Sequence, residues 1–89
     1  MNQYKEQSLL ELLDSPTIKA LLNIYGLGLK HIGVRLHLTP QAVFYLLKND
    51  KLKDWQRAKV LSLFQEYGMQ GLELVLINQM VNRKGGVKP

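Results

Sequence analysis

The side chains able to do catalytic or metal chemistry are few in this sequence of 89 residues. It has no cysteine, which excludes disulfides and thiolate metal sites, and its only imidazoles belong to His31 and His37. Two histidines are too few for a histidine-based zinc site without carboxylate help. No nucleophile, base and orienting group can be assembled from them and the scattered carboxylates, and the glycines at 26–28 lack the strand and helix that flank a phosphate-binding loop. We therefore expect no enzyme, no metal, no cofactor and no small-molecule ligand.

The charge balance favours an anionic partner. The formal net charge is +5 and the sequence pI is about 9.6. Nucleic acid and a membrane surface are the two candidates. No apolar run is long enough to span a bilayer, and no block separates a basic face from an aromatic-rich apolar face as membrane-surface helices do. The N-terminus lacks a signal-peptide pattern, so a cytoplasmic location is expected.

Turn residues divide the chain into short blocks with helical spacing, which predicts an all-α fold of five or six short helices. The first block covers 3–13. Ser15 is expected to cap the second block, with Pro16 at its first position, and Gly26 is expected to end it. The charged connector "KNDKLKD" precedes a block at 54–67, for which Asp54 is the expected cap.

Packing expectations for the block at 54–67 follow from its apolar residues. Its inner stripe is predicted to be Val60, Leu61, Phe64 and Tyr67, and Trp55 is expected to pack in the core.

The last block, at 72–83, has two possible interpretations. Its apolar run could form a strand, but its length and its continuation through Gln79 and Met80 favour a helix. As a helix it has one apolar face with Leu72, Val75, Leu76 and Met80. The other face carries the three residues assigned to a dimer interface, which are Leu74, Ile77 and Val81. A helix that is apolar on nearly all sides is buried on nearly all sides, either by a second copy or by a central place in one molecule.

Between these blocks, the stretch "IGVRLHLTPQAVFYLLK" at 32–48 predicts two short helices joined by a tight turn. Gly33 supplies a small residue where the second helix crosses the first, and Leu38 an apolar plug in the turn. Thr39 is expected to cap the second helix, and Val43 and Leu46 to face inward.

This pattern, Ile32-Gly33-x-x-Leu36-x-Leu38-Thr39-x-x-x-Val43-x-x-Leu46, resembles the helix-turn-helix of the lambda-repressor-like, Cro/Xre-type DNA-binding domains. The resemblance implies a single helix-turn-helix domain over 1–83, with its motif at 29–48 and a flexible basic tail at 84–89.

The chain departs from this family at two positions. His37 stands where the family usually has a glycine in left-handed conformation, so its expected role is structural. Leu29 replaces a glutamine that often contacts phosphate, so backbone N–H groups at 28–30 are the expected substitute.

The helical period then assigns an outer face to the second helix of the motif. Gln41, Ala42 and Tyr45 are the expected base contacts, since glutamine can bind adenine and alanine can meet a thymine methyl group. Lys48 and, in part, Phe44 lie on the same outer face, and Phe44 is expected to pack against the neighbouring helix. The expected phosphate contacts are Thr39, Lys48, Asn49, Lys51 and Lys53.

The resulting hypothesis is a sequence-specific, double-stranded-DNA-binding transcriptional regulator, a small repressor of the phage or plasmid kind. It would bind an operator as a homodimer, because one recognition helix contacts too few base pairs. The alternative is a protein-interaction module, such as an antirepressor or assembly factor, that uses the two helices only as scaffold.

Overall fold

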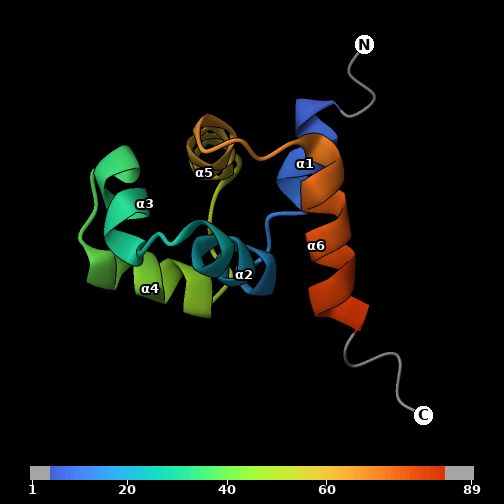
Figure 1. The fold of residues 1–89 in the computed structure, drawn as a ribbon. Helices are drawn as coiled ribbons and strands as arrows, with labels where there is room; N and C mark the ends of the chain where they lie inside the picture. The colour runs from blue at the N-terminus through green and yellow to red at the C-terminus, as the bar shows by residue number, and fades with distance from the viewer. Residues whose placement is uncertain (1–4, 84–89) are drawn as a thin grey trace.

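The computed structural model describes residues 5–83, and these form helices without any strand. The all-α prediction is confirmed, and the strand interpretation of the C-terminal block is wrong. The predicted basic tail at 84–89 lies outside the described residues. Figure 1 shows the six helices of the described range, which are α1 (Glu6–Glu11), α2 (Ser15–Tyr25), α3 (Leu29–Leu36), α4 (Pro40–Lys48), α5 (Asp54–Glu66) and α6 (Gly71–Arg83).

Buried apolar side chains from all six helices form one core. In Figure 1, α3 and α4 lie at one side of the molecule and α6 lies at the other, with α2 and α5 between them. Phe64 of α5 is completely buried, as are Ile18 of α2, Ile32 of α3 and Val43 of α4. The core therefore holds the α3–α4 pair on one side and α6 on the other.

The helix starts show how local hydrogen bonds set the boundaries. The side chain of Asp14, and not that of Ser15, caps α2, because the Thr17 N–H donates to Asp14 Oδ1 at 3.0 Å. The Ser15 hydroxyl donates instead to the Leu47 carbonyl on α4. Asp54 is likewise not the cap of α5 but its first residue, and the Lys53 N–H donates to Gln56 Oε1 at 2.9 Å.

Two aromatic residues near the ends of α5 are not in the core. Trp55 is 53% exposed and Tyr67 is 49% exposed, so the prediction that they pack inward is wrong. The helical period explains Trp55, because α5 buries Gln56, Val60 and Phe64 and thereby turns Trp55 outward. Tyr67 follows the last residue of α5, outside the period that orients the helix.

Polar contacts fix the rotation of α6 against the N-terminal half of the chain. Asn78 Nδ2 donates to the Leu12 carbonyl at 2.9 Å and to Thr17 Oγ1 at 3.1 Å. Asn82 Nδ2 donates to Asp14 Oδ2 at 3.1 Å and to the carbonyl of Asn78 at 2.8 Å. These bonds connect α6 to α2 and to the segment that precedes α2.

This rotation buries the face of α6 that was expected to form a dimer interface. Leu74 is completely buried, Ile77 packs partly buried against the core, and Val81 is partly buried. The assignment of Leu74, Ile77 and Val81 to a dimer interface does not fit this packing, because their face already covers the chain's own core.

Candidate nucleic-acid interface

The turn between α3 and α4 is short and closely packed. α3 ends at Leu36, and its C-cap His37 has φ +59° and ψ +42°. The Leu38 N–H donates to the Gly33 carbonyl at 2.8 Å. The left-handed conformation expected at His37 is confirmed. A Cβ on Gly33 would lie 2.5 Å from the Leu38 carbonyl oxygen. A glycine is therefore required there by the backbone of the turn, and not by a crossing of helix over helix as the sequence suggested.

The start of α4 is capped as the sequence predicted. Thr39 has extended backbone, and its Oγ1 accepts a hydrogen bond from the Ala42 N–H at 3.1 Å, with Pro40 as the first helical residue. A hydroxyl that accepts one bond retains its own proton to donate. Thr39 can therefore cap α4 and also donate to an external acceptor such as a phosphate.

The two faces of α4 differ sharply in exposure. Val43 and Leu47 are buried, and Leu46 packs partly buried against the core. On the opposite face, Gln41, Tyr45 and Lys48 are exposed to solvent. These three residues were predicted from the sequence to contact DNA. Ala42 lies at the margin of this face and is half-buried.

Phe44 also belongs to the outer face of α4, where the helical period places it in part, although it was expected to pack against the neighbouring helix. It is 45% exposed and does not pack away against a neighbouring helix. Its ring meets that of Tyr45 edge-on, with the ring centroids 5.7 Å apart. The spacing accounts for this placement, because Phe44 lies three residues after Gln41 and four before Lys48, which places all three on one side of a helix.

The connector after α4 presents cations. Lys48, Lys51 and Lys53 are exposed, and within residues 5–83 none of them takes part in an ion pair. Asp50 lies among them with φ +53°, and its carboxylate is 3.8 Å from Arg57. The three lysine side chains of this segment are thus exposed to solvent.

Asn49, the remaining predicted phosphate contact, is partly engaged within its own helix. Its Nδ2 donates to the Tyr45 carbonyl at 3.0 Å, which uses one of the two amide hydrogens.

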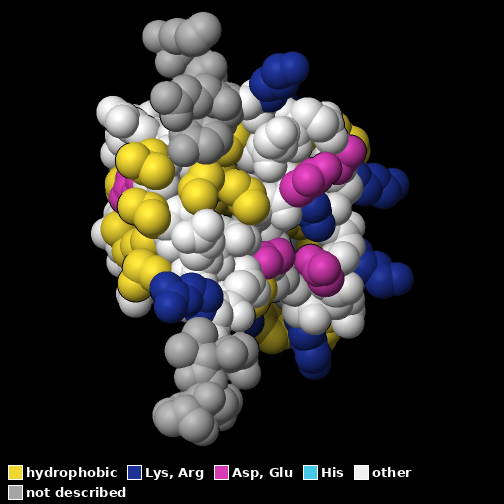
Figure 2. Space-filling view, turned by 90° about the vertical axis from the view of Figure 1, so that its right-hand side faces the viewer, with side chains coloured by type: hydrophobic (Ala, Val, Ile, Leu, Met, Phe, Trp, Pro, Cys, Tyr) yellow, Lys and Arg dark blue, Asp and Glu magenta, His cyan; other side chains and the backbone are white. Residues whose placement is uncertain are grey.

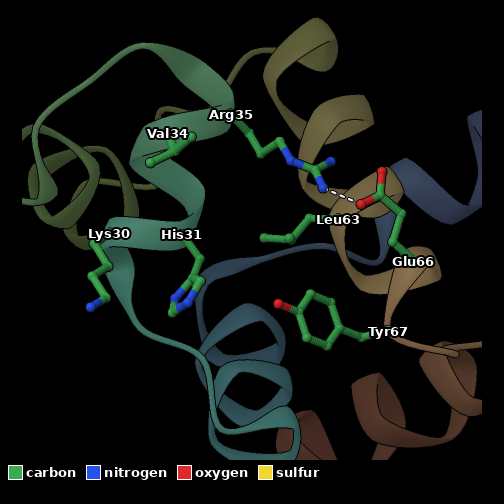
Figure 3. Close-up of a pocket in the computed structure, with 7 residues that line it drawn as sticks. All are labelled: Lys30, His31, Val34, Arg35, Leu63, Glu66 and Tyr67. Atoms are coloured by element: carbon green, nitrogen blue, oxygen red, sulfur yellow. Dashed lines mark hydrogen bonds and ion pairs between the residues drawn. The ribbon is translucent and has the colours of Figure 1, made fainter.

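The cations of α3 lie on a different surface. Lys30, His31, Val34 and Arg35 line a pocket of about 290 Å³ together with Leu63, Glu66 and Tyr67 (Figure 3). Arg35 forms an ion pair with Glu66 that ties α3 to α5. The pocket is thus formed by α3, α5 and Tyr67, and no residue of α4 lines it.

The backbone N–H groups at the start of α3 are not all open to a phosphate. The Gly28 N–H donates to Nδ1 of His31 at 3.0 Å. His31 therefore caps α3, and the substitute phosphate contact expected from Gly28 is already occupied by a side chain of the same chain.

Comparison with protein-family models, with curated proteins and with solved structures found no match. Within residues 5–83, no helix is long and apolar enough to cross a membrane. The same range contains no group of three or more histidine or carboxylate side chains placed to hold a metal ion.

Proposed function

We propose that this protein is a sequence-specific, double-stranded-DNA-binding transcriptional regulator, a small repressor of the phage or plasmid kind that binds its operator as a homodimer. The outer face of α4 enters the major groove. The connector that follows α4 contacts the phosphate backbone.

The observation that carries this proposal is the exposed outer face of α4. Gln41, Phe44, Tyr45 and Lys48 occupy one side of a nine-residue helix, and the other side is anchored in the core. A helix fits the major groove of B-DNA, where base edges can be distinguished. The capped start of α4 and the tight turn before it hold this face at a fixed angle to the rest of the molecule.

The outer face divides into residues that specify sequence and residues that supply affinity. Gln41 lies in the first turn of α4, where a glutamine can make a bidentate contact with adenine worth roughly 1–3 kcal/mol of discrimination. Phe44 offers apolar contact to a thymine methyl group. Lys48, Lys51 and Lys53 neutralise phosphates, a term that weakens as salt rises and does not depend on sequence.

Two alanine variants test whether Gln41 specifies sequence and Lys51 supplies affinity that does not depend on sequence. Gln41→Ala should lower affinity for the preferred duplex by about 5- to 150-fold while leaving affinity for unrelated duplexes unchanged. Lys51→Ala should weaken binding to every duplex alike and reduce the slope of log affinity against log salt by about 1. Lys5→Ala is the matched control, because Lys5 is exposed at the start of α1, away from α4 in Figure 1. Binding is measured by fluorescence anisotropy over a range of salt concentrations.

Equal losses on every duplex from Gln41→Ala and Lys51→Ala would contradict recognition of bases by α4. Unchanged binding in both variants, or an equal loss from Lys5→Ala, would show that α4 and its connector are not the DNA-binding surface.

The second candidate function is a protein-interaction module, and one observation favours it. Leu72, Leu76 and Met80 of α6 are exposed apolar side chains outside the α4 face. If Lys48, Lys51 and Lys53 can be replaced together by glutamine without loss of biological activity, this second function is favoured over DNA binding.

A further inference from the structure

The outward face of α6 is a line of exposed apolar side chains. Leu72, Leu76 and Met80 lie four residues apart and are 54%, 49% and 66% exposed. We call these three residues the α6 stripe. Figure 2, which views the molecule from the α6 side, shows hydrophobic side chains gathered in a band on this face. The stripe borders a groove of about 430 Å³ whose lining also includes Ile77 and Glu73.

The α6 stripe cannot be buried by a rotation of its own helix. The opposite side of α6 holds Leu74 in the core and is bonded through Asn78 to the Leu12 carbonyl and to the Thr17 hydroxyl. Turning α6 would expose Leu74 and leave these polar groups without partners, at a high energetic cost. A contiguous exposed apolar face on a small folded domain marks a contact site for another molecule.

The charges of α6 match a second copy of the same helix. Residues 74–82 include no charged side chain, so two copies of the stripe meet without repulsion. The charged residues of α6 are Glu73 near its start and Arg83 at its end. An antiparallel pair brings the Glu73 end of each helix beside the Arg83 end of the other, whereas a parallel pair brings like charges together.

The spacing of the stripe also suits an antiparallel pair. Leu76 is midway between Leu72 and Met80, so a two-fold axis at Leu76 places Leu72 of each copy opposite Met80 of the other. Such an interface is isologous and therefore closed at two copies.

We propose that the α6 stripe binds the α6 stripe of a second copy, with the two helices antiparallel and the two-fold axis at Leu76. This pairing deepens the proposed function, and its role in operator binding rests on that function. The interface is small, so we expect reversible, concentration-dependent association with a dissociation constant on the order of micromolar. DNA with two half-sites then binds both copies together.

Sedimentation without DNA tests the proposal, with substitutions that distinguish the faces. The wild-type chain should change from monomer to dimer as its concentration rises. Leu76→Glu should weaken this association by about 100-fold or more, because it buries two carboxylates side by side at the axis. Val34→Glu is the matched control, since Val34 is an apolar side chain 74% exposed on α3, and it should associate like the wild type. Circular dichroism verifies that each variant is folded.

Cysteine cross-linking tests the orientation, because the native chain has no cysteine. Leu76→Cys should form a disulfide-linked dimer under mild oxidation, since its partner residue is itself at the axis. Leu72→Cys should cross-link with Met80→Cys in a mixture of the two variants and not with itself, because a disulfide needs Cα atoms within about 7 Å. Cross-linking of Leu72→Cys to itself would overturn the antiparallel pairing.

The failures of this proposal and of the proposed function are separable. A wild-type chain that stays monomeric at every concentration, or a Leu76→Glu variant that associates normally, overturns the α6 pairing. Binding of Leu76→Glu to a duplex with one half-site tests α4 alone. If the wild type dimerises but neither protein binds any selected duplex, the pairing stands and the proposed function is refuted.

Discussion

Replacing Gly33 with alanine tests the close approach between α3 and the turn that leads into α4. The new Cβ would lie 2.5 Å from the Leu38 carbonyl oxygen, and real Cβ atoms stay at least 3.0 Å from such neighbours. The obstructing atom belongs to the backbone, so it cannot move away by a change of rotamer. The turn must therefore shift, and the 2.8 Å hydrogen bond from the Leu38 N–H to the Gly33 carbonyl must lengthen.

The magnitude for Gly33→Ala follows from three opposing terms. Overpacking costs about 1–3 kcal/mol and loss of the hydrogen bond about 1 kcal/mol. The better helix propensity of alanine offsets about 1 kcal/mol. We expect a net destabilisation of about 1–3 kcal/mol, which for a domain of this size lowers the melting temperature by roughly 5–20 °C.

The assay for Gly33→Ala is urea unfolding followed by circular dichroism, with Gly28→Ala as control. Gly28 has φ −122° and no atom within 4 Å of an added Cβ, so its variant should lose only the preference for glycine over alanine at the N-cap of α3, about 0.5–1 kcal/mol. A Gly33→Ala protein as stable as the wild type would refute the close approach and the turn geometry derived from it.

Two further predictions concern α6 and its contacts. Asn78→Ala should destabilise the protein by about 1–3 kcal/mol in urea unfolding, because it leaves the Leu12 carbonyl and the Thr17 hydroxyl without their donor. Asn23→Ala is the control and should have little effect, since Asn23 is exposed. Equal effects of the two substitutions would contradict the anchoring of α6. Burial and the hydrogen bond to the Glu73 carboxylate raise the pKa of Tyr25 from 10.0 to about 12. The stability that Tyr25 contributes is therefore complete below pH 10 and is lost as the pH rises towards 12. The difference in unfolding free energy between the wild type and Tyr25→Phe should shrink by on the order of 1–2 kcal/mol in that window. A difference that does not depend on pH would contradict the contact between Tyr25 and Glu73.

Features that depend on neighbours in the chain were predictable from the sequence. Gly26 ends α2 with φ +68°, Thr39 caps α4, and His37 is left-handed, because each of these depends on the backbone within a few residues. The shifted caps at Asp14 and Lys53 show the limit of this approach, since adjacent residues offer nearly equivalent hydrogen bonds to the first turn of a helix.

Features that depend on distant parts of the chain were not predictable in the same way. α6 is apolar on two faces, and contacts of Asn78 with Leu12 and Thr17, more than 60 residues earlier, decide which face is buried. Trp55 and Phe44 were expected to pack against other helices because they are aromatic. The rotation of their helices, which is set by neighbouring helices, instead leaves about half of each side chain in solvent. Within the candidate site, the exposure of Gln41 and Tyr45 followed from the helical period.

Selection of bound duplexes from a randomised DNA pool at near-physiological salt tests the central claim most directly, because only base contacts enrich particular sequences. We expect an enriched inverted repeat, and enrichment at the position contacted by Gln41 should disappear in the Gln41→Ala variant. An enriched single half-site would support recognition by α4 without paired copies. A pool that shows no enrichment, with binding that vanishes as salt rises, would contradict the proposed function and leave only charge attraction.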